Sequence, residues 1–201
     1  AWNPMEAFNF TIASEDHNLY TFDMRNLSIA LNVHTDHVGA VLDVDYSPTG
    51  REFVSGSYDK TIRIFKVDQG TSREVYHTKR MQRVFSVRYT LDASYVLSAS
   101  DDSNIRLWKA EASALTGIST PRQRQKIYYQ NKLISRYQHL PEIKKIHKKR
   151  HLPGDVSSIT RTKKIMRGSA KRKLENLRAH SAEGSIPHPP ERRKHVLQEH
   201  E

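Results

Sequence analysis

Apolar and polar residues alternate in short runs along the first half of the chain. The runs VLDVDY (41–46), from its second residue, and FSVRY (85–89) alternate between apolar and polar residues, and each is followed by a turn-like segment. A period of two places successive side chains on opposite faces of a sheet. The pattern therefore predicts short β-strands joined by tight turns.

One sequence motif occurs three times in this half, at a spacing of 43 residues. SGSYDKTIRIF (55–65) and SASDDSNIRLW (98–108) match position by position, and ASEDHNLYTF (13–22) is a fainter copy. The copies align the acids Asp16, Asp59 and Asp102, the apolar residues Leu19, Ile62 and Ile105, and the aromatics Phe22, Phe65 and Trp108. A period of about 40–45 residues with short strands and a closing aromatic is typical of a β-propeller blade.

The copies resemble WD repeats. The residues that carry the resemblance and are expected to hold the blades together are His37, Ser57, Asp59, Phe65, Asp102 and Trp108. The last copy has Lys79-Arg80 where the middle copy has Asp36-His37. Its usual hydrogen-bonded set of His, Ser or Thr, Asp and Trp is therefore expected to be incomplete.

His37, Asp59 and either Ser55 or Ser57 admit a second interpretation, as a nucleophilic triad. A triad needs an activated serine and an oxyanion site in an open cleft. The same spacing is what a blade uses to fix its own turns, so we favour the structural interpretation. We expect no catalytic residue and no enzymatic activity.

One blade cannot bury both faces of its sheet, and a propeller closes with typically 4–8 blades. We expect residues 1–110 to be about the last three blades of an all-β WD-repeat propeller, for which the resemblance implies seven, with the others N-terminal to Ala1. We also predict that this chain expressed alone exposes an unpaired sheet edge and aggregates or stays partly unfolded.

The apolar period changes to that of a helix after residue 120. Thr120 as a cap, Pro121 in the first turn and Gln123 predict a helix start. An apolar stripe then follows at steps of four, four and three, formed by Tyr129, Leu133, Tyr137 and Leu140. The sequence thus predicts a mainly α-helical extension over 111–201.

Two further helices are expected in this extension. PEIKKIHKKRHLPG (141–154) predicts a short helix, and 157–179 predicts a longer one that Gly168 weakens. The Pro-rich segment 180–201 is expected to be extended or disordered unless a partner orders it.

All of the excess of positive over negative charge lies in residues 122–201. Residues 1–121 hold 12 Lys and Arg against 15 Asp and Glu, a net charge of −3, whereas residues 122–201 hold 21 against 7, a net charge of +14. Such an asymmetry favours an anionic partner, and nucleic acid before a membrane surface. No run approaches the ~20 apolar residues that cross a bilayer, and we expect no membrane partner.

The basic residues of the helical segments are therefore candidate RNA contacts. Each cation that neutralises a phosphate releases a counterion, which predicts strong binding with little sequence preference. The alternatives are a merely solvated surface or an import signal in KKIHKKR (144–150). Tyr128, Tyr129 and Tyr137 could stack on bases, although we expect Tyr129 and Tyr137 to be half-buried. The candidates are Arg122, Arg124, Lys126, Lys132, Lys144, Lys145, Lys148, Lys149, Arg150, Lys163, Lys164, Lys171, Arg172 and Lys173.

Metal and cofactor sites are not expected. The chain has no cysteine, which excludes disulfides and thiolate ligands. His147 and His151 have a ligand-like spacing, but Lys148, Lys149 and Arg150 lie between them and would repel a cation. The sequence has no phosphate-binding glycine loop and suggests no small-molecule substrate.

The extension resembles that of the Sof-like family of nucleolar WD-repeat proteins. RYQHLPEIKKIHKKRHLPG (136–154) and KRKLENLRAHSAEGSIP (171–187) carry the resemblance, which runs over nearly the whole chain. It implies a non-enzymatic factor of the nucleus and nucleolus that assembles with the small-subunit processome and its U3 small nucleolar ribonucleoprotein in 18S pre-rRNA processing. The implied partners are pre-rRNA, U3 small nucleolar RNA and other processome proteins.

A second resemblance stays open beside the first. Phe22-Asp23-Met24-Arg25 resembles the aromatic-Asp-x-Arg element by which substrate receptors of cullin-4 ubiquitin ligases dock onto their adaptor. Phe22, Asp23 and Arg25 are the candidate contacts. The structural alternative is a simple turn contact between the acid and the arginine.

Overall fold

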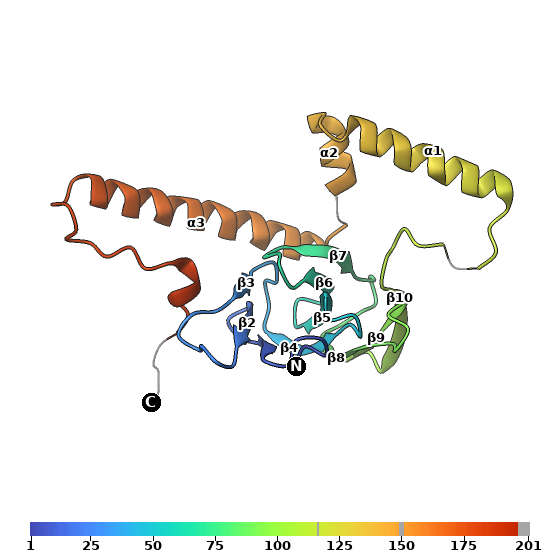
Figure 1. Cartoon of the computed structure of the whole chain (residues 1–201), viewed down its shortest axis with the longest axis horizontal. Helices are drawn as coiled ribbons and strands as arrows, with labels where there is room; N and C mark the ends of the chain where they lie inside the picture. The colour runs from blue at the N-terminus through green and yellow to red at the C-terminus, as the bar shows by residue number, and fades with distance from the viewer. Residues whose placement is uncertain (116, 149–150, 197–201) are drawn as a thin grey trace. The chain divides into compact units, whose positions relative to one another are not determined.

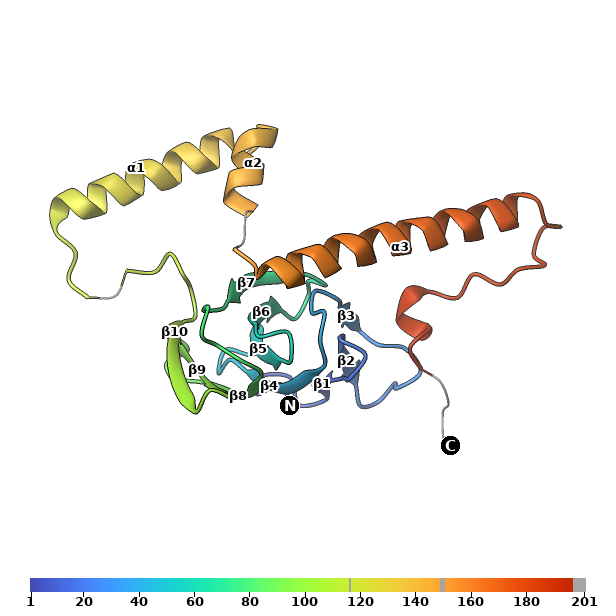
Figure 2. The same cartoon turned by 180° about the vertical axis from the view of Figure 1, so that it is seen from behind.

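The structure is a computed structural model, and it describes residues 1–115, 117–148 and 151–196, with side chains described up to Lys145 in the second range. The chain divides into two compact units (Figures 1 and 2). One unit is Ala1–Ala110 together with the segment from Leu152 onward, and the other is Glu111–His151.

Three antiparallel sheets make up the first 110 residues. The first has the order β1-β2-β3, the second β4-β5-β6-β7 and the third β10-β9-β8. The strands are β1 Asn9–Ala13, β2 Leu19–Asp23, β3 Asn32–His34, β4 Val41–Tyr46, β5 Glu52–Ser57, β6 Ile62–Lys66, β7 Ser72–Tyr76, β8 Val84–Tyr89, β9 Tyr95–Ser100 and β10 Asn104–Lys109. Each predicted copy therefore forms one sheet, which confirms the WD-repeat interpretation.

The repeat extends to the backbone conformation of the turns. His17, Lys60 and Ser103 follow the aligned acids of the three copies, and all three have positive φ values of 75°, 63° and 61°. In the first two copies the acid also accepts a hydrogen bond from the backbone N–H two residues on, at 3.0 Å from Asn18 and 2.9 Å from Thr61. The aligned acid thus fixes a turn whose next residue is left-handed.

The middle sheet lies between the other two (Figures 1 and 2), and apolar side chains fill both of its faces. Leu19 of the first sheet packs with Val44 and Phe65 on one face. Val54 and Ile64 pack with residues of the third sheet on the other face. Each outer sheet packs one of its faces against the middle sheet. On β10 of the third sheet, Ile105 remains 76% and Leu107 60% exposed.

Close approach of the second and third sheets requires a glycine. A Cβ placed on Gly56 would lie 2.8 Å from a methyl carbon of Val84 and 3.0 Å from one of Val87. Those distances are shorter than atomic contacts allow, so a side chain here would separate the sheets.

The predicted helices are present. They are α1 Pro121–Tyr137, α2 Pro141–Lys148 and α3 Gly154–Ala179, and a 3-10 turn, η1, covers Glu191–Arg193. Thr120 and Gln123 form the expected reciprocal cap of α1. The third helix begins three residues earlier than predicted and runs through Gly168 without a break. Among the described residues, no helix is both long enough and apolar enough to span a bilayer.

The segment after α3 returns to the first sheet. Ala30 donates its backbone N–H to the carbonyl of Arg192 at 3.3 Å, and the Arg192 guanidinium donates to the Leu31 carbonyl at 3.2 Å. These contacts lie next to β3, an edge strand of its sheet. Residues 180–196 therefore occupy part of a sheet edge.

Candidate nucleic-acid interface

His37 joins the turns of the middle blade. Its Nδ1 lies 2.9 Å from Oδ2 of Asp59 and its Nε2 lies 2.7 Å from Oγ of Ser55. Burial lowers the pKa of His37 and outweighs the attraction of the neighbouring carboxylate. Burial alone would raise the pKa of Asp59, but contacts with His37 and Thr61 hold it well below its usual range.

The His37 contacts have the connectivity of a nucleophilic triad, yet the serine is inaccessible. Ser55 is fully buried and His37 is 2% exposed. A nucleophile must reach the carbonyl that it attacks, and Ser55 instead also approaches the backbone carbonyl of Arg63 at 3.4 Å. These residues fix the blade, as the structural interpretation predicts.

The last blade has only part of the hydrogen-bonded set of His, Ser, Asp and Trp, as expected from Lys79-Arg80. Trp108 donates its indole N–H to Ser98 Oγ at 2.8 Å. Ser100 donates separately to Asp102 at 2.7 Å, and Arg106 also binds that carboxylate. Among the described residues, no histidine bridges the Trp108–Ser98 pair to the Ser100–Asp102 pair.

The candidate RNA contacts on α1 and α2 are exposed. They are Arg122, Arg124, Lys126 and Lys132 on α1 and Lys144 and Lys145 on α2. The sequence also predicts contacts for Lys148, Lys149 and Arg150, but the side chain of the first and the whole of the other two lie outside the described residues. No residue of α1 is buried within the described chain, so all four cations on this helix can reach a polyanion.

Tyr129 of α1 is more open than expected. Tyr128 is 70% and Tyr129 62% exposed, and Tyr137 is 39% exposed. The expectation of half-burial thus fits Tyr137 and is wrong for Tyr129. Exposed aromatic rings beside cations suit stacking on unpaired bases.

The candidates on α3 divide into two groups. Lys171, Arg172 and Lys173 are exposed. Lys163 is partly buried, and it lines a cavity of about 210 Å³ together with Lys164 and Arg167. The opposite wall is the loop 35–38 between β3 and β4. Sequence reasoning left Arg167 and Thr35 out of the candidate site, since nothing in the repeat indicates that this loop meets α3.

The Phe22-Asp23-Met24-Arg25 element is preorganised at the end of β2. The Arg25 guanidinium binds Asp23 Oδ2 at 2.7 Å and lies 4.6 Å from the centroid of the Phe8 ring. Hydrogen bonds from Arg25 lower the pKa of Asp23. The Arg25 side chain is nonetheless 65% exposed, so the pair closes a turn and still presents a guanidinium to solvent.

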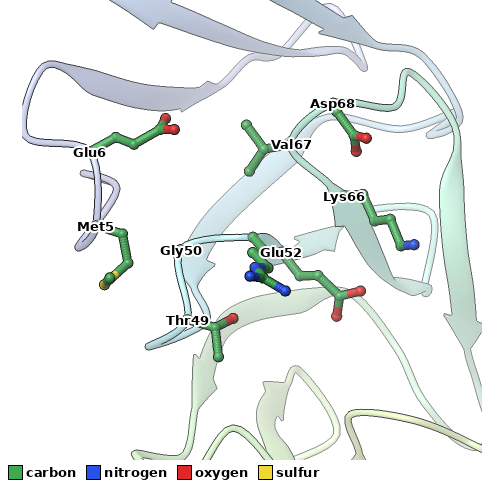
Figure 3. Close-up of a pocket in the computed structure, with 9 residues that line it drawn as sticks. Met5, Glu6, Thr49, Gly50, Glu52, Lys66, Val67 and Asp68 are labelled. Atoms are coloured by element: carbon green, nitrogen blue, oxygen red, sulfur yellow. The ribbon is translucent and has the colours of Figure 1, made fainter.

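A larger cavity of about 830 Å³ lies beside the loop that carries Phe8. Figure 3 shows Met5 and Glu6 on one side of it and Val67 and Asp68 on the other. Its wall also includes the segment 49–52 and Lys66, so acids and cations are mixed. A wall of mixed charge has no excess of cations that would favour a polyanion.

No metal centre is found in the described parts of the chain, where no three His, Asp or Glu side chains gather as ligands. The side chain of His147, one of the two histidines with ligand-like spacing, lies outside the described residues.

Comparison with known protein families agrees with this architecture. The WD domain, G-beta repeat family matches residues 29–66 and 72–109, and the Sof1-like domain family matches residues 110–196. The chain thus carries WD repeats followed by a Sof1-like domain. The resemblance drawn from the extension and the fold class of propeller blades followed by helices are thereby confirmed.

Two names occur among the Sof1-like relatives. "DDB1- and CUL4-associated factor 13" of Danio rerio is 55% identical and that of Xenopus laevis 56% identical, each over 98% of this chain and 44% of its own length. "Protein SOF1" of Saccharomyces cerevisiae is 51% identical over 98% of this chain and 40% of its own length. The chain thus spans less than half the length of these relatives.

Proposed function

We propose that this Sof1-like chain belongs to a non-enzymatic ribosome-biogenesis factor. In this role it assembles in the nucleolus with the small-subunit processome and its U3 small nucleolar ribonucleoprotein, and it is needed for 18S pre-rRNA processing. The observation that carries the proposal is the match of residues 110–196 to the Sof1-like domain, in the same segment that holds the exposed cations of α1 to α3. The 51% identity with "Protein SOF1" over nearly the whole chain supports it.

The blades and the helices differ in net charge, and this difference suits them to different partners. The acidic blades offer surfaces of mixed charge to protein neighbours, and the cationic helices contact pre-rRNA or U3 small nucleolar RNA through phosphates. The buried Ser55 supports a scaffolding role, because the residues with triad connectivity are closed to substrate. No cofactor is needed for such a role.

Crosslinking of the cellular protein to RNA, followed by sequencing, tests this proposal. Reads concentrated on U3 or on the 18S precursor are expected. Lys144→Glu with Lys145→Glu should reduce these reads and slow 18S precursor processing, because the exposed cations are reversed. Lys79→Glu with Arg80→Glu changes the charge equally on the blades and should have little effect. An empty crosslinking library would refute the proposal.

A second candidate function is a substrate receptor of a cullin-4 RING ubiquitin ligase. The exposed and preorganised Arg25 favours it, together with the name of the Danio rerio relative. Arg25→Ala should then abolish capture of the ligase adaptor, whereas Arg51→Ala, an exposed arginine of the middle blade, should not. Retained capture by the Arg25 variant would exclude this docking element.

A further inference from the structure

The cavity between α3 and the β3–β4 loop gathers positive charge at one point. Lys163, Lys164 and Arg167 line it from the helix. Arg167 follows Lys163 by four residues and Lys164 by three, so its side chain neighbours both on the helix surface. The loop 35–38 forms the facing wall. The cations therefore line a crevice of the molecule, whereas Lys171, further along α3, lies 3.8 Å from Glu175.

Within the described residues these three cations interact with acids only at longer range, Arg167 with Glu191 and Lys163 with Asp59 and Asp16. None of them forms an ion pair there. Burial lowers the pKa of Lys163, and repulsion from Arg167 lowers it further, against weaker attraction from Asp59 and Asp16. Like charges at close range are stabilised by a counter-ion. The crevice is thus electrostatically suited to an anion.

The one acid in the wall is already committed elsewhere. Asp36 Oδ2 accepts hydrogen bonds from the backbone N–H of Ser72 at 2.7 Å and from its hydroxyl at 2.6 Å. The buried guanidinium of Arg63 lies 3.5 Å from the same oxygen. The nearby His37 uses both ring nitrogens within the blade. Neither residue therefore neutralises the lysines of the helix.

Hydroxyl groups complete the lining. Thr160 donates its hydroxyl to the Val156 carbonyl at 2.7 Å, which leaves Thr35 to offer a hydroxyl to a ligand. Two ammonium groups, one guanidinium and one hydroxyl are the donors that proteins direct at phosphate oxygens.

Positive charge continues along α3 beyond the crevice. Lys164, Arg167 and Lys171 follow one another at steps of three and four and so share one face of the helix. Lys163 and Lys171 are separated by about 12 Å along the axis at 1.5 Å per residue. The row suits a polymer of phosphates better than a single small ion.

We propose that this crevice is a phosphate-binding site for one backbone phosphate of single-stranded RNA. Lys163, Lys164, Arg167 and Thr35 hold the phosphate, and the neighbouring nucleotides follow α3 towards Lys171. The proposal rests on the proposed RNA-binding function and deepens it, because it assigns the buried end of α3 a fixed contact.

Lysine footprinting tests the site in the protein purified intact from cells. The amines are modified with and without a 12-nucleotide single-stranded RNA of mixed sequence, and protection is read by mass spectrometry. Strong protection of Lys163 and Lys164 is expected. Protection of Lys126 and Lys132 on α1 without these two would overturn the crevice and leave RNA binding intact. Protection of no lysine would overturn the RNA-binding function as well.

A matched pair of variants tests the energetics. Lys163→Gln with Arg167→Gln removes two charges in the crevice, and Lys79→Gln with Arg80→Gln removes two exposed charges from the blades, away from α3. The crevice variant should lose about ten-fold in RNA affinity, and its log-log salt slope should fall by about 0.7, the value of one phosphate contact on a single strand. Equal losses in both variants would show diffuse attraction and overturn the site.

Two controls complete the test. Lys163→Arg keeps the charge and should keep the affinity, whereas a loss with this variant would mean that the double variant disturbs packing and would count against the site. A phosphorylated peptide of the same length serves as competitor. If the peptide protects Lys163 and Lys164 and RNA does not, the occupant is a protein and the RNA site is refuted.

Discussion

Tyr20 and His195 are 175 residues apart in sequence, and their rings pack at an interplanar angle of 47° with centroids 4.9 Å apart. The Tyr20 hydroxyl lies 3.1 Å from Nδ1 of His195 and donates its hydrogen to Asp16. It follows that His195 donates through Nδ1. This contact holds the end of the chain beside the first sheet.

Removal of the Tyr20 hydroxyl should release the tail. Burial and the neighbouring Asp16 raise the pKa of Tyr20 to about 12, so the hydroxyl keeps its hydrogen at physiological pH. Tyr20→Phe should cost about 1 kcal/mol of local stability and raise hydrogen exchange of residues 190–196 about five-fold. Tyr95→Phe is the control. Unchanged exchange in the Tyr20 variant would show that the contact does not hold the tail.

Asp59→Asn should destabilise the middle blade. The change leaves the buried His37 without its charged partner and weakens the turn at Thr61, and we expect a loss of about 2–3 kcal/mol in the free energy of unfolding. The matched change in the first copy, Asp16→Asn, affects an exposed acid and should cost less than about 1 kcal/mol. Chemical denaturation of the intact protein compares the two, and equal losses would contradict the assigned role of His37.

His34 should make stability depend on pH. Burial lowers its pKa to about 4, against a hydrogen bond to the Gln69 carbonyl at 2.7 Å. The unfolded chain has the ordinary value near 6.5, so it binds more protons than the folded chain between these two values. Stability is then complete above about pH 6.5 and falls as the pH drops towards 4, by at most about 3 kcal/mol.

Melting temperatures measured from pH 7.5 to 4 check the His34 prediction. The variant His34→Asn should start from a lower stability and lose less of it across the same range, because the titrating group is gone. Its amide can still donate to the Gln69 carbonyl. A wild-type protein and a variant with the same pH slope would show that other groups account for the acid sensitivity.

The uncovered edge at β10 should make the chain aggregate when expressed alone. Ile105 and Leu107 are exposed on this edge strand, and such edges pair with other chains. Ile105→Lys with Leu107→Lys should increase the monomeric fraction in size-exclusion chromatography with light scattering, since charges on an edge oppose pairing. A monodisperse wild-type chain that melts cooperatively would contradict this prediction.

Sequence spacing was enough to predict the blades and the start of α1. The aligned acids and aromatics recur every 43 residues, and the Thr120 cap is a local signal. The return of Arg192 to Ala30 and Leu31 could not be predicted, because isolated hydrogen bonds between residues so far apart in sequence leave no periodic pattern. The same holds for Thr35 and Arg167, which share the α3 crevice although no repeat connects them.

Three residues, each next to an aligned acid, have a left-handed backbone conformation, and substitutions there should raise the stability of the protein. They are His17, Lys60 and Ser103. Side chains with a Cβ disfavour this conformation by roughly 1–2 kcal/mol, and glycine adopts it freely at some entropic cost in the unfolded chain. Exchange of Lys60 or Ser103 for glycine should therefore raise thermal tolerance slightly, while the pairing of the strands stays intact. Each of the three blades has one such position, so the same gain in stability is available once per blade.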